Sequence, residues 1–107
     1  MAFYYPVPSP VIEFLVLGLV AEEASYGYEI SQNLKLITAI KESTLYPILK
    51  KMELSGYLET YTEAHQGRQR KYYRRTQAGA QHFSFLEEEW KRYSRAIEDM
   101  AKGRLGK

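Results

Sequence analysis

A proline inside a helical pattern is the feature that most restricts the fold of this sequence. Residues 43–54 carry apolar side chains at the three- and four-residue spacing of one helix face, namely Leu45, Ile48, Leu49 and Met52. Pro47 lies inside this stretch and has no N–H to donate, which a helix tolerates best in its first turn. The pattern therefore predicts a helix that begins at Ser43 or Thr44, has Pro47 in its first turn and stops before Gly56.

The rest of the chain predicts two helices before this one, and a hairpin and a long helix after it. The expected elements are a helix at residues 9–23, a short helix at 25–34 capped by Ser25, a brief β-rich connection at 37–40, a hairpin at 57–75 and a long helix capped by Thr76. Gly67 is expected at the hairpin tip, and the chain from Gly103 onward is expected to fray. This order predicts a mainly α (α+β) fold, a winged helix-turn-helix with a long C-terminal helix.

The residues needed for catalysis or metal binding are scarce. The sequence has no cysteine, its only histidines are His65 and His82, and its only aspartate is Asp99. A thiolate metal site or a nucleophile–histidine–acid constellation therefore has almost no candidate residues. We expect no enzyme activity, no metal and no cofactor, with His65 in the hairpin turn and His82 on a helix surface.

The N-terminal region predicts neither export nor membrane insertion. The first basic residue is Lys35, so the positive flank of a signal peptide is missing. The apolar run at residues 10–20 contains Glu13 and is shorter than the ~20 residues that cross a bilayer. We therefore expect a soluble, cytoplasmic protein without a membrane partner.

Hydroxyl groups cluster at the start of the 43–54 helix. Ser43, Thr44 and Tyr46 fall in its expected first turn, where backbone N–H groups and the helix dipole favour an anion such as a phosphate. Lys50 and Lys51 lie farther along the outward side. An alternative is that the hydroxyls only cap the helix and the lysines form a solvated face. The order of elements favours DNA, because the third helix of a winged helix-turn-helix enters the major groove.

The hairpin carries a run of cations. No acid lies between Glu63 and Glu87, whereas this interval contains Arg68, Arg70, Lys71, Arg74 and Arg75. Charge on an exposed hairpin can serve only to prevent edge-to-edge aggregation, but a run of one sign is better explained by contact with phosphates. Alternation places Tyr72 and Tyr73 on opposite faces of the strand, and we expect at least one of them in the core.

Apolar residues of the last helix alternate steps of three and four, as in a coiled coil. They are Phe83, Leu86, Trp90, Tyr93, Ile97 and Met100. Charged residues flank this seam at i,i+4 spacing, in the pairs Glu87–Lys91, Glu88–Arg92 and Arg95–Asp99. We interpret residues 76–107 as a dimerisation helix and residues 1–75 as a DNA-binding domain, together one structural domain.

Three segments in combination resemble the PadR family of bacterial transcriptional regulators. They are YGYEI at residues 26–30, TLYPILKKMELSGYL at 44–58 and GRQRKYYRRTQAG at 67–79. The resemblance implies a dimeric, usually repressing, effector-responsive regulator of the short form, which lacks the larger C-terminal domain of the phenolic-acid regulators. It also implies that the residues facing DNA are Ser43, Thr44, Tyr46, Lys50, Arg68 and Arg70. The run of cations in the hairpin adds Lys71 to this set.

Trp90, the single tryptophan, lies in the middle of the seam. In a two-fold dimer it can approach its own copy and form a flat slot for a planar ligand. The short multidrug-binding repressors of the PadR family are similar, since they carry a tryptophan at the matching position. The expected ligand contacts are Trp90, Phe83, Glu87 and Tyr93, with further lining from Phe3, Tyr4 and Tyr5. Acids near Trp90 favour a cationic aromatic ligand, while the alternative is that Trp90 only fills the dimer core.

Two functions from different classes follow. The first is a homodimeric repressor that binds a double-stranded DNA operator and is released by a small aromatic ligand at the dimer interface. The second is a protein–protein adaptor that uses the winged helix and the last helix without an inducer or a specific operator. A regulator that binds DNA without responding to a ligand lies between them.

Overall fold

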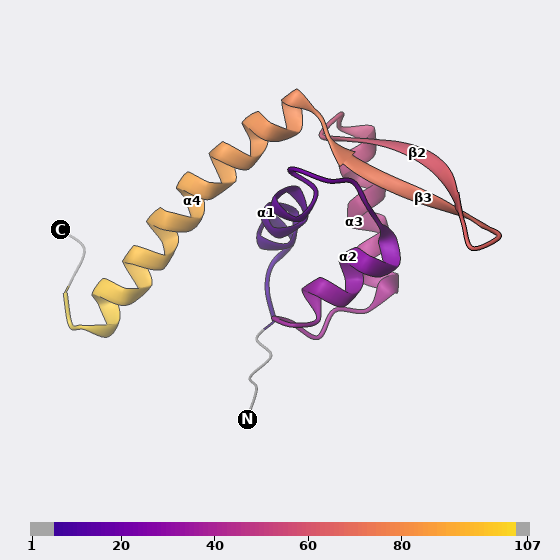
Figure 1. Ribbon diagram of the computed structural model, residues 1–107. Coiled ribbons are helices and arrows are strands. Elements are labelled where there is room, and N and C mark those ends of the chain that lie inside the picture. The colour runs from indigo at the N-terminus through magenta and orange to yellow at the C-terminus, as the bar shows by residue number, and fades with distance from the viewer. Residues whose placement is uncertain (1–5, 105–107) are drawn as a thin grey trace.

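A long C-terminal helix extends from a body of three shorter helices and a small antiparallel sheet (Figure 1). The computed structural model describes residues 6–104. Its elements are α1 (Ser9–Leu19), β1 (Ser25–Tyr26), α2 (Gly27–Leu34), α3 (Glu42–Leu54), β2 (Leu58–His65), β3 (Arg68–Arg75) and α4 (Gln77–Ala101). This is the predicted α+β fold, a winged helix-turn-helix with a long C-terminal helix.

The sheet is antiparallel and has the strand order β1-β3-β2. β2 and β3 pair residue by residue, from Leu58 with Arg75 to His65 with Arg68. Gln66 and Gly67 join them, with φ of 51° and 80°. Positive φ at both central residues is the signature of a type I′ turn, whose twist suits a hairpin. The predicted hairpin, with Gly67 at its tip, is therefore confirmed.

Strand β1 is an element that the sequence did not predict. Ser25 and Tyr26 pair with Tyr73 and Tyr72 of β3, so Ser25 lies in the sheet and does not cap α2. The Ser25 hydroxyl donates instead to the carboxylate of Glu29. A strand of two residues is too short to show an alternating pattern in the sequence. It is recognised only by its pairing with β3.

The ends of α1 and of the connection after α2 also differ from the predictions. α1 ends at Leu19 rather than near Glu23, because the chain has to reach the edge of β3 by residue 25. Residues 37–40 form a turn and extended chain, not a strand. Their β-branched side chains fit extended backbone, but no strand lies beside them to pair with.

Pro47 lies in the second turn of α3, not in the first as predicted. The N-cap is Lys41 and the helix begins at Glu42. The missing N–H of Pro47 therefore leaves the carbonyl of Ser43 without its helical donor. Both residues are exposed, so water can satisfy this carbonyl, and the proline costs less here than at a buried position.

The core forms where α1, α2 and α3 meet the sheet and the first half of α4. Its fully buried residues include Val16, Leu17, Ile30, Leu34, Leu45, Leu49 and Met52. The predicted apolar face of α3 is therefore the face that packs on the body. Tyr73 joins the core from β3 and is only 6% exposed, whereas Tyr72 is half-buried on the opposite face of the strand.

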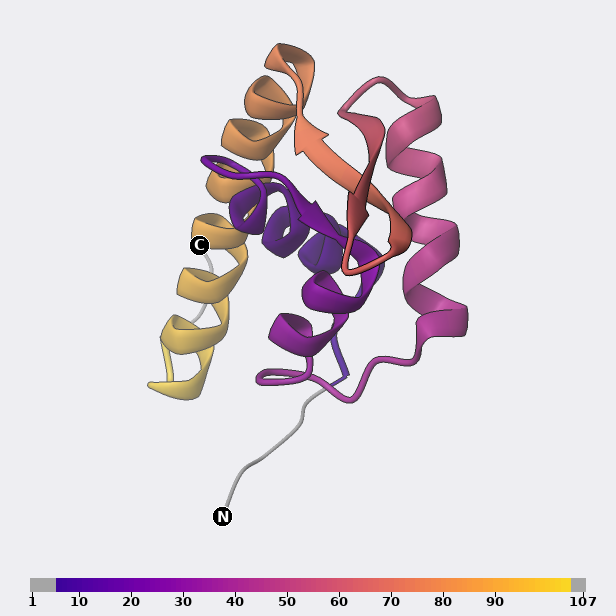
Figure 2. The same cartoon turned by 45° about the vertical axis from the view of Figure 1, so that its right-hand side comes forward.

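The first turn of α4 lies close to the turn that ends α3 (Figure 2), and hydrogen bonds join them. Thr76 caps α4 as predicted, since its hydroxyl oxygen accepts from the N–H of Gly79 at 2.9 Å. The same hydroxyl donates to the carbonyl of Gly56 at 2.6 Å, and the Thr76 N–H donates to the carbonyl of Tyr57 at 3.1 Å. Gly56 has a φ of 83° and ends α3 where the sequence predicted.

The far end of α4 is capped at Gly103 and Arg104, where fraying was expected, and residues 105–107 lie outside the described residues. Gly103 has a φ of 80°, and its N–H donates to the carbonyl of Met100. The N–H of Arg104 donates to the carbonyl of Asp99 at 2.8 Å, which completes a Schellman motif. Glycine at this position lets the chain turn back and satisfy the last carbonyls of the helix.

Replacing Gly79 by alanine should destabilise the protein. Gly79 is buried, and a Cβ there would lie 2.1 Å from the carbonyl oxygen of Tyr57, which is backbone and cannot swing away. We expect a loss of about 1–3 kcal/mol in the free energy of unfolding, as for other overpacked sites. Chemical denaturation with linear extrapolation measures it.

Gly18→Ala is the matched control. Gly18 lies inside α1 and is exposed, and a Cβ there meets only the Phe83 ring at 3.4 Å. Alanine raises helix propensity, so this variant should be as stable as the parent or slightly more so. Equal stability of the two variants would contradict a tight approach of α4 to Tyr57.

Candidate nucleic-acid interface

The outward side of α3 carries the residues that the sequence assigned to DNA. They are Ser43, Thr44, Tyr46 and Lys50, and all four are exposed. Leu45 and Leu49 alternate with them and are fully buried, so core packing fixes which side of the helix faces outward. The helix therefore presents hydroxyl groups and a cation on its exposed side.

Glu42 occupies the N-terminus of α3. Its carboxylate accepts from the Ser31 hydroxyl at 3.2 Å and from the Lys35 ammonium at 3.3 Å. A hydrogen bond from its own backbone N–H, followed by those from Lys35 and Ser31, lowers the pKa of Glu42. An ionised carboxylate thus interacts with the positive end of the helix, where a phosphate was expected. The groups that α3 leaves free for a partner on its outward side are therefore exposed side chains.

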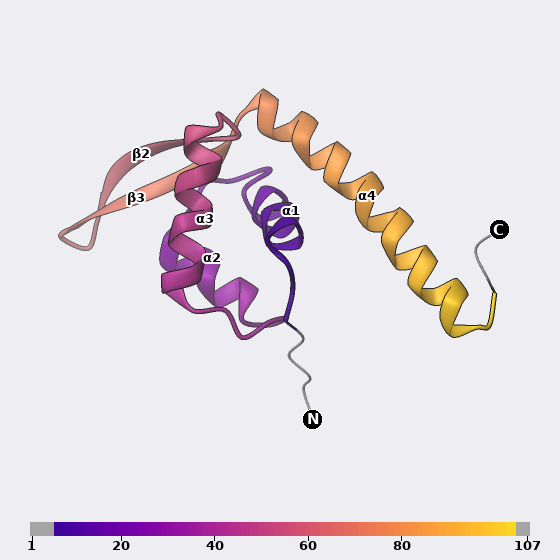
Figure 3. The same ribbon diagram turned by 180° about the vertical axis from the view of Figure 1, so that it is seen from behind.

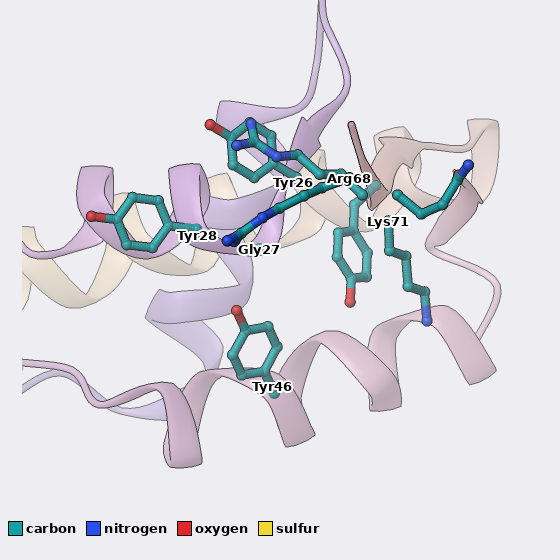
Figure 4. Close-up of a pocket in the computed structure, with 9 residues that line it drawn as sticks. Tyr26, Gly27, Tyr28, Tyr46, Arg68 and Lys71 are labelled. Atoms are coloured by element: carbon teal, nitrogen blue, oxygen red, sulfur yellow. The ribbon is translucent and has the colours of Figure 1, made fainter. Parts of the chain in front are cut away.

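A groove of about 710 Å³ lies between α3, the start of α2 and the hairpin (Figure 4). Aromatic and basic side chains dominate its lining, which consists of Tyr26, Gly27, Tyr28, Tyr46, Arg68, Gln69, Arg70, Lys71 and Tyr73. Figure 4 shows Tyr46 rising from α3 on one side and Tyr28 and Arg68 on the other. Tyr46, Arg68, Arg70 and Lys71 belong to the predicted DNA-facing set, so the fold brings these four to one groove.

Gly27 lets Tyr46 close one end of this groove. A Cβ on Gly27 would lie 2.6 Å from the Tyr46 ring and 2.9 Å from its hydroxyl oxygen. The Tyr46 ring therefore lies directly against the start of α2, and 42% of the residue stays exposed. The position of Tyr46 depends on a glycine that is 19 residues away in the chain.

The basic residues of the hairpin have different surroundings. Arg68 is exposed at the start of β3. The Arg70 guanidinium lies 4.3 Å from the centre of the Tyr26 ring, within cation–π distance. Arg74 pairs with Glu59 at 2.9 Å, and Arg75 lies over the Phe83 ring of α4 at 5.2 Å. The groove therefore receives Arg68 and Arg70, while Arg74 and Arg75 interact elsewhere.

Lys71 is paired with an acid of α3. Its ammonium lies 3.0 Å from the carboxylate of Glu53, which also accepts from the Thr60 hydroxyl at 3.0 Å. The bond to Lys71, followed by that to Thr60, lowers the pKa of Glu53, and the same bond to Glu53 raises the pKa of Lys71. Lys71 thus lines the groove as part of an ion pair that fastens the hairpin to α3.

Comparison with known proteins identifies the family. The model of the PadR-like family of transcriptional regulators matches residues 16–84, which include α2, α3 and the whole hairpin. The chain belongs to the PadR-like family of transcriptional regulators. Regulators of this family bind DNA, so DNA is the partner to which membership points.

Solved structures agree with this assignment. The crystal structure of smu.1704 from Streptococcus mutans UA159 is 53% identical, covers 98% of this chain and 99% of its own, and has a TM-score of 0.92. A PadR family transcription regulator from Clostridium difficile R20291 is 27% identical over 84% of this chain and 97% of its own, with a TM-score of 0.76. A transcriptional regulator from Clostridium thermocellum is 33% identical over 84% of this chain and 92% of its own, with a TM-score of 0.75.

In this PadR-like chain the apolar seam of α4 divides into two parts. Phe83 stacks on Phe14 of α1, with ring centres 5.1 Å apart, and Leu86 is 8% exposed in the core. The other four seam residues are exposed: Trp90 (42%), Tyr93 (59%), Ile97 (50%) and Met100 (71%). Of the predicted dimer set, Phe83 and Leu86 thus pack within their own chain, and the other four are the residues left exposed.

The charged residues that flank the seam also pair differently from the prediction. Lys91 lies 3.9 Å from Glu88 and Arg92 lies 3.5 Å from Glu89, so both ion pairs have i,i+3 spacing. Three- and four-residue spacings are both neighbours on a helix, which the sequence pattern does not separate. Asp99 pairs with Arg104 at 3.3 Å.

A second cavity, of about 270 Å³, lies at Trp90, between α4 and the start of α1. Its lining consists of Pro8, Pro10, Val11, Phe14, Leu86, Glu89, Trp90 and Tyr93. Of the predicted ligand contacts, Trp90 and Tyr93 are present, whereas Phe83 and Glu87 are not. Glu87 is turned about 100° around the helix from Leu86, so the acid in this cavity is Glu89. Phe3, Tyr4 and Tyr5 lie outside the described residues.

His82 is not the surface residue that the sequence predicted. Its ring stacks on Tyr57, with centres 4.1 Å apart, and its Nε2 lies 3.4 Å from the carboxylate of Glu13. His65 ends β2 beside the hairpin turn, as expected. Within residues 6–104 no cluster of three or more His, Cys, Asp or Glu residues could hold a metal ion, and no helix has the length and apolarity to span a membrane.

Sequence reasoning missed the part of the groove that β1 and α2 supply. Tyr26, Gly27 and Tyr28 line it together with Gln69 of β3. Their segment, YGYEI, carried the family resemblance, but no pattern within it says that it faces the hairpin. Two exposed or half-buried tyrosines around a glycine were the available signal, and pairing of β1 with β3 is what brings them to the site.

The stability gained from Glu53 should depend on pH. Its carboxyl has a lower pKa in the folded chain than in the unfolded one, so its contribution is complete above the ordinary carboxyl pKa and is lost as the pH falls through the lowered value. Because both partners are partly exposed, we expect at most about 1 kcal/mol. The difference in Tm between the parent and Glu53→Gln should be full near pH 6 and shrink below about pH 4.

Glu63→Gln provides the control for this titration. Glu63 is an exposed glutamate of β2 and undergoes the same change in charge and shape. It should change Tm little at any pH. A Tm difference for Glu53→Gln that stays constant down to pH 3 would show that its carboxylate does not stabilise the fold through its charge.

Proposed function

We propose that this PadR-like protein is a homodimeric repressor that binds a specific DNA operator and releases it when a planar aromatic ligand occupies the dimer interface. The observation that carries the proposal is the groove that Tyr46 of α3 lines together with Arg68 and Arg70 of the hairpin. Phosphate contact by cations and base contact by an exposed helix are the two components of specific DNA binding.

The groove and the exposed residues of α3 beside it have different roles in this proposal. Ser43, Thr44 and Tyr46, at the outer end of α3, read base edges in the major groove. Lys50, Arg68 and Arg70 contact phosphates, and the hairpin acts as the wing beside the groove. Lys71 contributes less charge because Glu53 neutralises it. In a dimer the two α3 helices would read half-sites ~34 Å apart.

The exposed part of α4 supports a dimer. Trp90, Tyr93, Ile97 and Met100 are between 42% and 71% exposed and lie along one face of the helix. The second half of α4 leaves the body, as Figures 1 and 3 show. The radius of gyration is 15.8 Å, above the roughly 13 Å of a compact domain of this length. A second copy that covers this stripe would remove its apolar surface from water.

The cavity at Trp90 supports ligand binding at the same interface. It is lined mainly by apolar and aromatic groups and contains one carboxylate, from Glu89. A planar aromatic cation can stack on Trp90 and satisfy this charge. Two copies facing each other would double the cavity. If the ligand changes the distance between the α3 helices, it weakens operator binding, and the operator must weaken ligand binding by the same factor.

Arg68→Ala should weaken DNA binding without changing sequence preference. Losing one phosphate contact reduces the slope of log K against log salt by about 0.9, for specific and unrelated duplexes alike. Fluorescence anisotropy measures this, with DNA from upstream of the protein's own gene and an unrelated competitor across a salt series. Arg104→Ala, at the far end of α4, removes the same charge and should leave the slope unchanged.

Two outcomes would contradict these roles. A loss at one base pair alone would mean that Arg68 reads a base. If the parent protein binds all duplexes equally and weakly, the operator proposal fails and a protein–protein adaptor becomes the better explanation.

Ile97→Glu should produce monomers that bind both DNA and ligand poorly. The carboxylate would be buried unpaired at the centre of the proposed interface, which is strongly unfavourable. Sedimentation velocity measures the assembly state, and quenching of Trp90 fluorescence by a phenanthridinium dye measures ligand binding. Ala96→Glu, an adjacent exposed position on α4, is the control and should remain dimeric. An Ile97→Glu dimer would exclude this face as the interface.

A further inference from the structure

The joint between α3 and α4 is built from one face of α4. Thr76, Gly79 and His82 follow one another at three-residue intervals and all contact the turn at Gly56 and Tyr57. The His82 ring lies flat on the Tyr57 ring, with 7° between their planes. The residues that end the proposed recognition helix are therefore in direct contact with the first turns of the proposed dimerisation helix.

A buried carboxylate of α1 completes this joint. Glu13 is 8% exposed and lies in a helix that is otherwise apolar on its inner side. Its Oε1 lies 3.4 Å from Nε2 of His82 on α4, and its Oε2 lies 3.9 Å from the ammonium of Lys51 on α3. One carboxylate thus connects the two helices whose relative position decides where α3 points.

Stability alone does not explain a glutamate here. Removing a carboxylate from water is costly, and apolar residues of similar volume often give equal or greater stability than a buried ion pair. What a carboxylate adds is direction, because its two oxygens bond only to partners in particular positions. The Lys51 side chain is 72% exposed, so its bond is the weaker one, and His82, with 20% exposed, is the principal partner.

We propose that Glu13 is a positioning residue that, mainly through His82 and secondarily through Lys51, fixes the angle between α4 and α3. This inference rests on the proposed function, since the angle sets the spacing of the two recognition helices in the dimer. Loss of Glu13 leaves α4 attached through Thr76 and Gly79 and packed on α1 through Phe83 and Leu86, but removes the polar contacts that set its angle to α3. The effect is therefore on the orientation of α3 and on DNA affinity more than on folding.

The orientation can be measured directly, because the sequence has no cysteine. Leu54→Cys on α3 and Lys91→Cys on α4 are exposed sites for two spin labels. Pulsed electron paramagnetic resonance then gives the distance distribution between the helices, with labelled protein diluted in unlabelled protein so that only distances within one chain are seen. The compared backgrounds are the parent, Glu13→Gln, His82→Gln, the double variant and Lys51→Met.

We expect Glu13→Gln and His82→Gln to broaden the distance distribution and to weaken operator binding about fivefold, with the double variant no worse than either single one. Lys51→Met should also broaden the distance distribution and weaken operator binding, but by less than Glu13→Gln or His82→Gln does. Glu22→Gln, an exposed glutamate just after α1, is the control for charge and should change neither. If Glu13→Gln does not fold, His82→Gln and Lys51→Met still test both contacts.

Two results would overturn the proposal. One is a distance distribution that matches the parent in every folded variant. The other is additive loss of affinity in the double variant, which would show that Glu13 and His82 act separately. The distance measurement needs no DNA, so it tests the role of Glu13 even if the protein binds no specific operator. Failure of the Glu13 proposal can therefore be distinguished from failure of the operator proposal.

Discussion

The contact between the turn that ends α3 and the first turn of α4 is the constraint on which the rest of the structure depends. Thr76 caps α4 and at the same time bonds to Gly56, and Gly79 lets the helix approach the Tyr57 carbonyl. Because β2 begins directly after Tyr57 and β3 ends directly before Thr76, this one contact also closes the base of the hairpin. The proposed recognition surface and the C-terminal helix are therefore attached to the same few backbone atoms.

The hairpin shows that a run of like charges in sequence is not a uniform charged surface. Strand alternation and twist give each cation a different neighbour: Arg70 lies over Tyr26, Lys71 binds Glu53 and Arg74 binds Glu59. Only part of the run is left for a partner. The net charge of the chain is only +2. For a regulator of this kind, the attraction to DNA depends on the positions of the cations more than on their number.

α4 combines two tasks that the seam pattern does not distinguish. Its first half packs on α1 through Phe83 and Leu86, and its second half leaves Ile97 and Met100 in solvent. A single heptad pattern thus serves the fold of one chain and, in our proposal, its assembly with another. Between the halves, Trp90 borders a cavity that the start of α1 helps to line, so a ligand there would touch α4 and α1, the helix that carries Glu13.

The sequence by itself determined the helices of residues 43–54 and 76 onward and the hairpin with Gly67 at its tip, because these depend on local periodicity, capping and turn chemistry. The resemblance of three of its segments indicated the family. It also indicated four residues that meet in the groove: Tyr46, Arg68, Arg70 and Lys71. Only the tertiary structure decided that residues 25–26 form a strand, that Tyr73 rather than Tyr72 is in the core and that His82 is a joint residue. Each of these depends on a partner distant in the chain, and local patterns carry no information about such partners.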